Sequence, residues 1–266
     1  KELLKKAYNF ASDGHLNQKR ASGEPYITHP LQVALYLSEL SMDLETIIAA
    51  ILHDLIEDTD ITYKNIKKEF GTDVANIVDG VTKLDKIQYN TNEEAKAEAI
   101  RKMVIAMSKD IRVLILKLAD RLHNIQTINY LADYKQERIA SETLYVYAPL
   151  AHRLGLQNIK HILEDISFGL LHKNQNLEIE NLIQKSAPNR DKNIKKSVKV
   201  IEGLLADNSL SAEVIGRPKH NYSIYKKIIN NGLTFNEIND LVGLRILTDD
   251  VKNCYTILGL IHANFQ

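Results

Sequence analysis

The stretch "IIAAILHDLIEDTDITY" (residues 47–63) limits the possible folds more than any other segment, because it sets ionisable side chains in apolar sequence. A buried acid is unfavourable unless it is paired or binds a cation. On a helix, residues four apart lie on one face, so Glu57 follows His53, and Asp58 follows Asp54, by one turn. The segment therefore predicts a helix with two polar columns that need a compensating partner.

The residue types in these columns suit a metal ion. An imidazole nitrogen beside a carboxylate oxygen is a favourable pair of ligands for a first-row divalent metal. The carboxylates one turn further on could hold or deprotonate a water, or protonate a leaving oxygen. The alternative is that Glu57 and Asp58 only open a polar turn before the next helix, and this segment alone leaves both interpretations open.

The surrounding sequence predicts an all-helical N-terminal half, up to about residue 150. One helix starts at Pro30 and another covers residues 43–57, each with apolar residues at helical spacing. Thr62 is expected to cap a third helix, with Ile61 and Ile66 as a hydrophobic staple and Gly71 as its end. Residues 88–98 are polar and predict a connector or an exposed helix start, and residues 136–172 continue as helix.

A second polar group lies far along the chain, in "KDIRVLILKLADRLHNIQTI". One apolar stripe there contains Ile111, Ile115, Leu118, Leu122 and Ile125. Asp120, Asn124 and Thr127 fall on the opposite face, which could simply be solvated. However, residues 113–116 are apolar all round and indicate a buried helix, whose polar face would need a polar partner such as a metal site. His29, just before Pro30, is by itself more typical of a structural histidine.

The C-terminal part has a different pattern. The segment "KSAPNRDKN" breaks the helical period and predicts a domain transition near residues 175–200. The segments "AEVIGRPK" and "LVGLRILTD" predict strands that flank a helix, which indicates an α/β unit. In "GRPKHNYSIYKK", cations alternate with two tyrosines. That pattern fits a small RNA-binding patch or a solvated amphipathic helix.

Composition excludes several classes of protein. The 34 Lys and Arg residues balance 34 Asp and Glu residues, so no overall basic charge points to nucleic acid. One cysteine, Cys254, permits no internal disulfide and predicts a cytoplasmic location. Without an apolar run of about 18 residues, no membrane span is expected. The sequence starts without Met and ends within an unfinished pattern, so we expect it to be trimmed at both ends.

Four motifs, in order, carry a family resemblance: "KRASGEPYITHP", "LHDLIEDT", "VTKL" and "LKLADRLHN". They resemble the HD hydrolase domain of the bifunctional Rel/SpoT enzymes, which make and destroy the alarmone (p)ppGpp. "YAPLAHRLGL" is similar to that family's helical connection, and "GRPKHNYSIYKKI" with "DLVGLRIL" to the first half of its synthetase domain. The resemblance implies a mainly α chain, with an all-helical HD domain (1–150), a helical connector (151–200) and the start of an α/β synthetase domain (201–266).

The resemblance also implies roles in hydrolysis. It implies a metal ion, typically Mn²⁺, bound by His29, His53, Asp54 and Asp120. Glu57 and Asp58 would be the catalytic acids. Arg20 would pack on the guanine base, while Asn124 and Thr127 would hold the nucleotide. Water would release pyrophosphate from the 3′ position of (p)ppGpp and leave GDP or GTP. Ala21 stands where some members have Lys, which could shift the preference between ppGpp and pppGpp.

In the synthetase part, the resemblance implies ATP contacts by Arg217, Lys219, Ser223 and Lys227 and a Mg²⁺ ligand at Asp240. That enzyme transfers the β,γ-pyrophosphate of ATP to the 3′-hydroxyl of GDP or GTP. The family's guanine-stacking Tyr, a basic loop and the second carboxylate lie beyond "HANFQ". We therefore expect no synthetase activity from this chain as given. Contacts with the ribosome and tRNA would come from domains outside it.

Two other functions fit the same residues. One is an HD phosphohydrolase acting on a different nucleotide, which the residues 20–24 and Thr127 disfavour. The other is a nucleotide-sensing regulatory module with a silent hydrolase site. The complete set of ionisable residues disfavours that reading: His29, His53, Asp54, Glu57, Asp58 and Asp120.

Overall fold

The computed structural model describes residues 1–85, 110–238 and 241–265. Most of these residues are helical, and one two-stranded sheet lies near the C-terminus. The mainly α class with a C-terminal α/β segment is therefore confirmed. The chain forms two compact units, Lys1–Leu171 and His172–Gln266. The polar segment 88–98 lies outside the described residues.

Unit 1 begins with six helices: α1 (Glu2–Gly14), α2 (Thr28–Glu39), α3 (Leu44–Leu52), α4 (Leu55–Asp58), α5 (Tyr63–Phe70) and α6 (Thr72–Asp85). Local side chains fix several of their ends. Asp43 caps α3 by accepting a hydrogen bond from the Thr46 amide at 2.9 Å. Thr62 caps α5 in a capping box with Asn65, and Gly71 ends that helix with φ 92°, as the sequence predicted.

The second half of unit 1 starts with α8 (Ile111–Gln126) and continues through η1 (Ile128–Tyr130), α9 (Asp133–Glu142), the π-helix η2 (Thr143–Tyr147), α10 (Ala148–Arg153) and α11 (Gln157–Leu171). The continuous helix expected over 136–172 is thus interrupted. Gly155 has φ 76°, a conformation that L side chains rarely adopt, and it separates α10 from α11.

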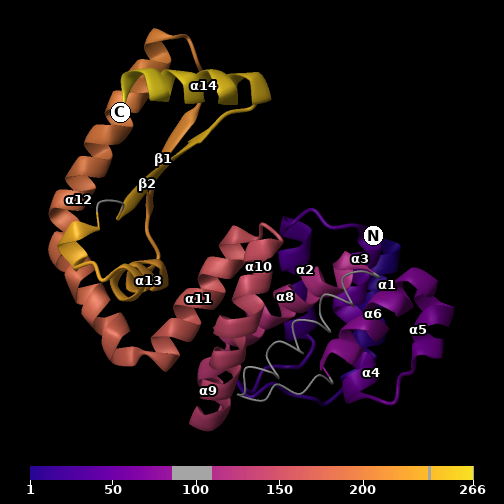
Figure 1. Cartoon of the computed structure of the whole chain (residues 1–266). Coiled ribbons are helices and arrows are strands. Elements are labelled where there is room, and N and C mark those ends of the chain that lie inside the picture. The colour runs from indigo at the N-terminus through magenta and orange to yellow at the C-terminus, as the bar shows by residue number, and fades with distance from the viewer. Residues whose placement is uncertain (86–109, 239–240, 266) are drawn as a thin grey trace. The chain divides into compact units, whose positions relative to one another are not determined.

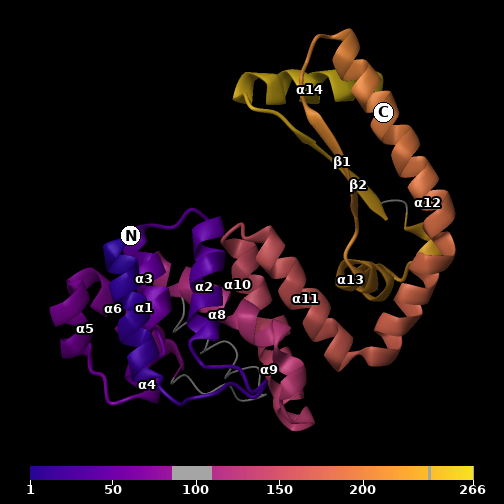
Figure 2. The same cartoon turned by 180° about the vertical axis from the view of Figure 1, so that it is seen from behind.

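Helix α8 lies at the centre of unit 1, against α2, α3, α6 and α11, as can be followed in Figures 1 and 2. Val113, Leu114, Leu116, Leu118, Leu122 and Ile125 are buried, which confirms the central helix. The predicted stripe is wrong at its first position, since Ile111 is 40% exposed. Gly80 lets α6 approach closely, because a Cβ there would lie 2.7 Å from Val113 Cγ2.

The helix predicted over residues 43–57 is broken where the chemistry is expected. Helix α3 ends at Leu52 and α4 starts at Leu55, so His53 and Asp54 form a turn between them. The imidazole Nδ1 of His53 lies 2.8 Å from the Ala50 carbonyl oxygen. In a continuous helix that carbonyl would accept from the Asp54 amide, so the side chain competes with the helical bond.

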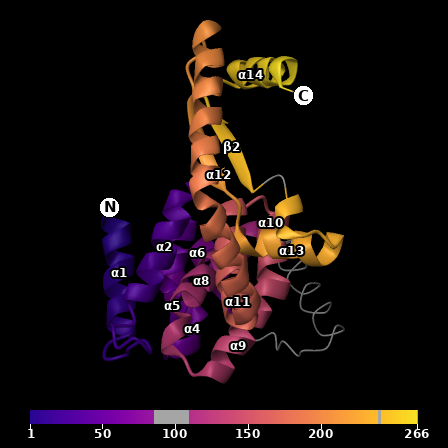
Figure 3. The same ribbon diagram turned by 90° about the vertical axis from the view of Figure 1, so that its left-hand side faces the viewer.

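Unit 2 contains α12 (Lys173–Asp207), β1 (Glu213–Pro218), α13 (Asn221–Asn231), η3 (Phe235–Glu237), β2 (Val242–Leu247) and α14 (Val251–Asn264). The strands predicted on either side of a helix are confirmed. They pair antiparallel, with Glu213 opposite Leu247 and Pro218 opposite Val242. Figure 3 shows α12 running past the sheet, with α13 and α14 at opposite ends of the sheet. Ile201, Leu205, Val214 and Ile257 form a small core.

The helix break expected at "KSAPNRDKN" is wrong, because α12 crosses this segment without interruption. Buried apolar residues lie on both sides of it, Ile179 towards the start and Ile201 and Leu205 towards the end. We attribute the continuous helix to these anchors, which outweigh local propensity. The domain boundaries at 150 and 200 stay predictions.

Among the described residues, no helix combines the length and the apolar character that crossing a membrane requires.

Candidate metal centre

Four predicted ligands come from three regions of unit 1. His29 lies in the first turn of α2, where Pro30 supports the helix start. His53 and Asp54 occupy the turn between α3 and α4, and Asp120 lies in the central helix α8. His29, His53 and Asp120 are each at least 97% buried, with exposed fractions of 1%, 2% and 3%. Packing of α2, α3 and α8 therefore brings distant residues into one buried place.

The ligand atoms face one another closely. One atom each of His29, His53 and Asp120 lie within 4.8 Å of one another, a spacing that could hold a metal ion. Asp120 Oδ1 is 3.1 Å from His29 Nε2 and 3.9 Å from His53 Nε2. Asp54 contacts the same nitrogens, with Oδ1 3.1 Å from His53 Nε2 and Oδ2 3.5 Å from His29 Nε2. The structure thus brings all four predicted ligands together.

The tautomer of His53 suits metal binding. Because Nδ1 lies 2.8 Å from the Ala50 carbonyl oxygen, it carries a hydrogen and donates it there. Nε2 faces the two aspartates, and in the neutral ring it carries no hydrogen and is open to a metal ion. Metal-bound histidines commonly have their second nitrogen held in this way. The residues present therefore fit a divalent cation.

His123 holds the other imidazole, and the sequence did not single it out. Its Nδ1 lies 2.7 Å from His29 Nδ1, so one ring donates to the other. Burial, together with the nearby His29 and Arg20, lowers the pKa of His123 to about 4. A neutral His123 can accept from His29 Nδ1 and leave His29 Nε2 facing Asp120. The sequence feature that could have indicated His123 is its place in "LKLADRLHN", three residues after Asp120 on the same helix.

Asp120 is further held by Lys117, which the sequence also did not single out. The Lys117 ammonium lies 2.6 Å from Asp120 Oδ2 and is itself buried, with 5% exposure. Asn124 donates to Oδ1 at 2.6 Å. Burial opposes ionisation of Asp120, but Lys117 and the two histidines hold its pKa well below the usual range. Asp120 is therefore a carboxylate at neutral pH.

The two predicted acids lie on α4, one turn after His53 and Asp54, and both are exposed. The Asp58 amide donates to the Asp54 carbonyl at 2.9 Å, so the one-turn spacing of these residues survives the helix break. The Tyr26 hydroxyl lies 2.9 Å from Asp54 Oδ2 and 2.8 Å from Asp58 Oδ2. Burial and the two aspartates raise the pKa of Tyr26, so its hydroxyl keeps its hydrogen. The sequence did not single out Tyr26.

The predicted nucleotide contacts also lie together beside this centre. The Arg20 guanidinium donates to Asn124 Oδ1 at 2.8 Å and to Thr127 Oγ1 at 3.4 Å. Asn124 in turn donates to Asp120, so one amide joins Arg20 to a predicted metal ligand. The guanidinium lies 5.7 Å from the centre of the Tyr26 ring.

The histidines predict how the stability of the metal-free chain depends on pH. Burial opposes protonation of His53, but Asp54 and Asp120 raise its pKa to about 9. The charged form of His53 therefore stabilises the fold. This stabilisation is complete below the unfolded pKa of about 6.5, and it is lost as the pH rises through about 9. The difference of about 2.5 pKa units corresponds to at most about 3–4 kcal/mol, at about 1.4 kcal/mol for each pKa unit.

His29 and His123 act in the opposite direction, because burial lowers the pKa of both. Their neutral forms stabilise the fold above about pH 6.5, and this is lost as the pH falls. We expect the melting temperature of the chelator-treated chain to be highest near pH 6.5 and to fall on both sides. His53→Gln should remove the decrease on the alkaline side. A melting temperature that rises steadily from pH 6.5 to pH 9 would contradict the assignment.

The predicted ATP contacts lie in unit 2. Arg217 is in β1, Lys219 follows it and donates its amide to the Leu241 carbonyl at 3.0 Å, and Ser223 and Lys227 are on α13. Asp240 lies outside the described residues. The two tyrosines of "NYSIYKK" stack on each other with ring centres 6.2 Å apart, and the Lys226 ammonium lies 4.8 Å from the Tyr222 ring. The structure thus places these predicted residues around β1 and α13.

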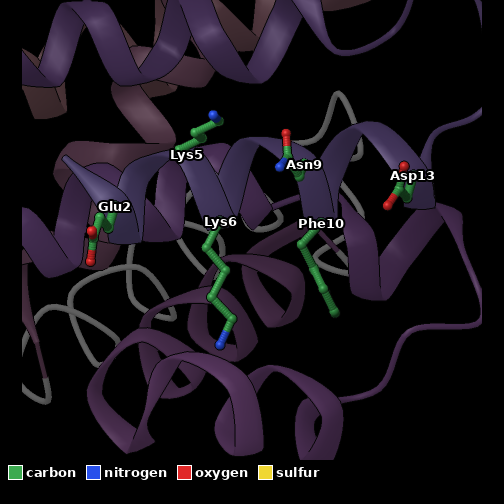
Figure 4. A pocket seen from close by; sticks show the side chains of 6 residues that line it. All are labelled: Glu2, Lys5, Lys6, Asn9, Phe10 and Asp13. Carbon is green, nitrogen blue, oxygen red and sulfur yellow. The ribbon is translucent and has the colours of Figure 1, made fainter.

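A shallow hollow of ≈ 450 Å³ lies along α1, away from these residues. Its lining consists of Glu2, Lys5, Lys6, Asn9, Phe10 and Asp13. Figure 4 shows Lys6 and Phe10 leaving one side of α1 and Lys5 and Asn9 the other. Lys6 pairs with Glu69 at 2.9 Å, and the Phe10 and Phe70 rings meet edge to face at 5.4 Å. These contacts attach α1 to α5, so the hollow is a feature of packing.

Known proteins resemble this chain in two regions. The profile of the HD domain matches residues 7–157, which is more than half of the chain, and that of a region found in RelA/SpoT proteins matches residues 216–266. The chain is 50% identical over 263 residues to a GTP pyrophosphokinase of Streptomyces antibioticus. It is 45% identical over 263 residues to the bifunctional (p)ppGpp synthase/hydrolase SpoT of Escherichia coli K12.

A third relative, from Aquifex aeolicus, is named guanosine-3′,5′-bis(diphosphate) 3′-pyrophosphohydrolase and is 45% identical over 266 residues. These alignments cover 99–100% of this chain, but only 31% of the Streptomyces protein and 38% of each of the other two. The chain thus spans about a third of the length of its relatives. The HD-domain match, the RelA/SpoT region after it and this similarity along the whole sequence together place the chain in the HD-domain family, in its Rel/SpoT group.

Proposed function

We propose that unit 1 hydrolyses the 3′-pyrophosphate of (p)ppGpp to give GDP or GTP and pyrophosphate. The observation that carries this proposal is the meeting of His29 from α2, His53 from the turn after α3 and Asp120 from α8 in one buried place. Arg20, Asn124 and Thr127 lie next to that place and could bind a nucleotide there. The names of the relatives from Escherichia coli and Aquifex aeolicus, which refer to this reaction, support the same substrate.

We further propose that His29, His53, Asp54 and Asp120 hold one Mn²⁺ ion. Two imidazoles and two carboxylates form a donor set that manganese accepts, and they would leave positions for water and a phosphate oxygen. When bound, such an ion lowers the pKa of a water molecule and offsets the negative charge of the pyrophosphate. The exposed acids of α4 would otherwise repel this anionic substrate.

Glu57 and Asp58 are proposed to move the protons of the reaction. Water attacks the phosphorus that is bonded to the 3′-oxygen, and the bond between this phosphorus and the 3′-oxygen breaks. One carboxylate takes a proton from the attacking water, and a carboxylic acid gives one to the departing 3′-oxygen. Both side chains are exposed on α4, one turn from His53 and Asp54, so they can reach a substrate there.

The nucleotide is proposed to bind beside Arg20, whose flat guanidinium can stack on a guanine base. Arg20 already donates to Asn124 and Thr127, which would keep its plane in position. Asn124 also donates to Asp120, so the base-binding side chain and the metal ligand share one partner. This arrangement would place the ribose 3′ position near the acids.

The longer protein is proposed to be bifunctional and to act in the stringent response. Its GTP pyrophosphokinase activity would use ATP bound by Arg217, Lys219, Ser223 and Lys227, with Mg²⁺ at Asp240. The similarity to the Streptomyces GTP pyrophosphokinase supports this proposal. The exposed thiol of Cys254 is consistent with a reducing cytoplasm, and contacts with the ribosome would come from other domains.

The test is to incubate the chain with ppGpp and Mn²⁺ and to follow GDP and pyrophosphate. We expect equal amounts of both products, and we expect both product formation and ppGpp binding to stop when a chelator removes the metal. His53→Ala is expected to be folded and inactive. Other nucleotides, assayed in the same way, are expected to be poor substrates. Rapid hydrolysis of a nucleotide without a 3′-pyrophosphate would favour the broader HD phosphohydrolase, and no turnover of any nucleotide would favour a silent sensing module.

A further inference from the structure

Tyr26 lies at the end of the connection between α1 and α2, two residues before α2 starts. That connection is pinned by its own backbone, since the Tyr26 amide donates to the Gln18 carbonyl at 3.0 Å and the Arg20 amide to the Glu24 carbonyl at 2.9 Å. The hydroxyl reaches across to the turn between α3 and α4. It contacts one oxygen of Asp54 and one oxygen of Asp58.

A tyrosine hydroxyl has one hydrogen to donate and can accept through its oxygen. Its one hydrogen goes to one of the two carboxylates at a time, so Asp54 and Asp58 share it at nearly equal distances. Asp54 Oδ2 is the oxygen that it contacts, which leaves Oδ1 beside His53 Nε2 at 3.1 Å. The hydroxyl therefore restrains the rotation of the Asp54 carboxylate as well as the place of Asp58.

The ring is held on several sides. It stacks on His15, with ring centres 4.6 Å apart and planes at 25°, and it meets His29 edge to face at 6.1 Å. His15 contacts Gln18 Oε1 at 2.7 Å, and Gln18 Nε2 donates to the Asp58 carbonyl at 3.0 Å. The connection between α1 and α2 thus contacts Asp58 twice: Tyr26 contacts the Asp58 carboxylate, and Gln18 contacts the Asp58 backbone carbonyl. Such a support gives the hydroxyl a fixed position.

We propose that Tyr26 is a positioning residue, which through one hydroxyl sets the separation between a metal-binding carboxylate, Asp54, and a proton-transferring carboxylate, Asp58. The proposal rests on the proposed function of unit 1. Its role is to act through these two side chains, which its hydroxyl contacts, rather than on the reacting atoms. Its ring lies below Arg20, so loss of the hydroxyl leaves the base-binding surface in place.

The test compares Tyr26→Phe with the unchanged chain. Residues that orient metal ligands typically change metal affinity or activity by about 10- to 100-fold when they are replaced. We expect Tyr26→Phe to weaken Mn²⁺ binding by about tenfold, measured by calorimetry without nucleotide, and to lower kcat for ppGpp by about 10- to 100-fold. KM at saturating Mn²⁺ should stay unchanged, because Phe keeps the ring that supports Arg20.

Tyr63→Phe is the matched control. The Tyr63 hydroxyl donates to Asn76 Oδ1 at 2.8 Å, between α5 and α6. The Tyr63→Phe variant therefore loses one hydrogen bond outside the candidate centre. We expect it to leave Mn²⁺ affinity, kcat and KM unchanged. Melting temperatures of both variants fix an assay temperature at which each is folded. In an Asp58→Asn background, Tyr26→Phe should lower kcat less than in the unchanged chain, because one of its two targets is no longer an acid.

The outcomes separate this inference from the proposed function. If the unchanged chain neither binds Mn²⁺ nor hydrolyses ppGpp, the proposed function fails and the inference fails with it. If the unchanged chain does both and Tyr26→Phe matches it in Mn²⁺ affinity and kcat, only the inference is overturned. An effect of Tyr26→Phe on KM alone would also overturn it, because the hydroxyl would then contact the nucleotide.

Discussion

Asp120→Ala is expected to abolish hydrolysis of ppGpp and to lower the free energy of unfolding by about 3–5 kcal/mol. The loss of activity follows from the loss of a proposed metal ligand. The loss of stability has a separate cause, the Lys117 ammonium, which is 5% exposed and lies 2.6 Å from Asp120 Oδ2. Without Asp120 this buried charge loses its carboxylate partner, and a buried ion pair with one member removed is strongly destabilising. Urea unfolding and release of GDP measure the two effects.

Asp120→Asn separates the two causes. Its side-chain oxygen keeps the shape of the site and can still accept from Lys117, so we expect a clearly smaller loss of stability. Hydrolysis should be lost to the same extent, because a neutral amide is a poor replacement for an anionic ligand. Equal unfolding free energies for the Ala and Asn variants would contradict the role given to Lys117. A wild-type rate in either variant would remove Asp120 from the proposed metal site.

Several features of the fold could be predicted because they depend on short segments. The cap at Thr62 and the stop at Gly71 require only a few neighbouring residues, and both are present. The buried helix α8 could be recognised because its sequence is apolar on more than one face. The strands β1 and β2 also follow from local composition. Local signals were sufficient in these places.

Two predictions failed where a tertiary contact or a side chain outweighs local propensity. The helix break expected at "KSAPNRDKN" rested on local breakers, but apolar anchors on both sides of it are buried in unit 2. The break in the helix at residues 43–57 lies at His53, whose imidazole takes the Ala50 carbonyl. No periodic pattern reports that bond, because it depends on a single rotamer.

The sequence predicted the side chains that meet in the candidate site, but it did not predict the residues that hold them. Helical spacing placed His53 and Asp54 one turn before the acids, and resemblance joined them to His29 and Asp120. The residues that hold these ligands are Tyr26, Lys117 and His123. Tyr26 and His123 act across 28 and 94 residues of sequence, so only the packing of α2, α3 and α8 reveals them. Lys117 is close to Asp120 in sequence, but a lysine in a helix usually indicates a solvated face.

The Mn²⁺ affinity of the chain is expected to rise by about tenfold for each pH unit between about pH 6 and pH 8. A metal ligand must be deprotonated, and the pKa of His53 in the metal-free chain is about 9. Protons therefore compete with Mn²⁺ for His53 Nε2 over this whole range. Asp120, with its lowered pKa, is already ionised there, and His29, whose pKa burial lowers, is already neutral. His53 alone should set the slope.

This argument fixes a second quantity, the number of protons released on binding. Calorimetry in buffers with different ionisation enthalpies should give about one proton for each Mn²⁺ near pH 7. His152→Gln, which removes a histidine from α10 outside the candidate centre, should change neither the slope nor the proton count. Two protons would show that His29 is also charged in the metal-free chain. An affinity that does not change with pH would mean that Mn²⁺ does not bind at His53, and the proposed ligand set would then be wrong.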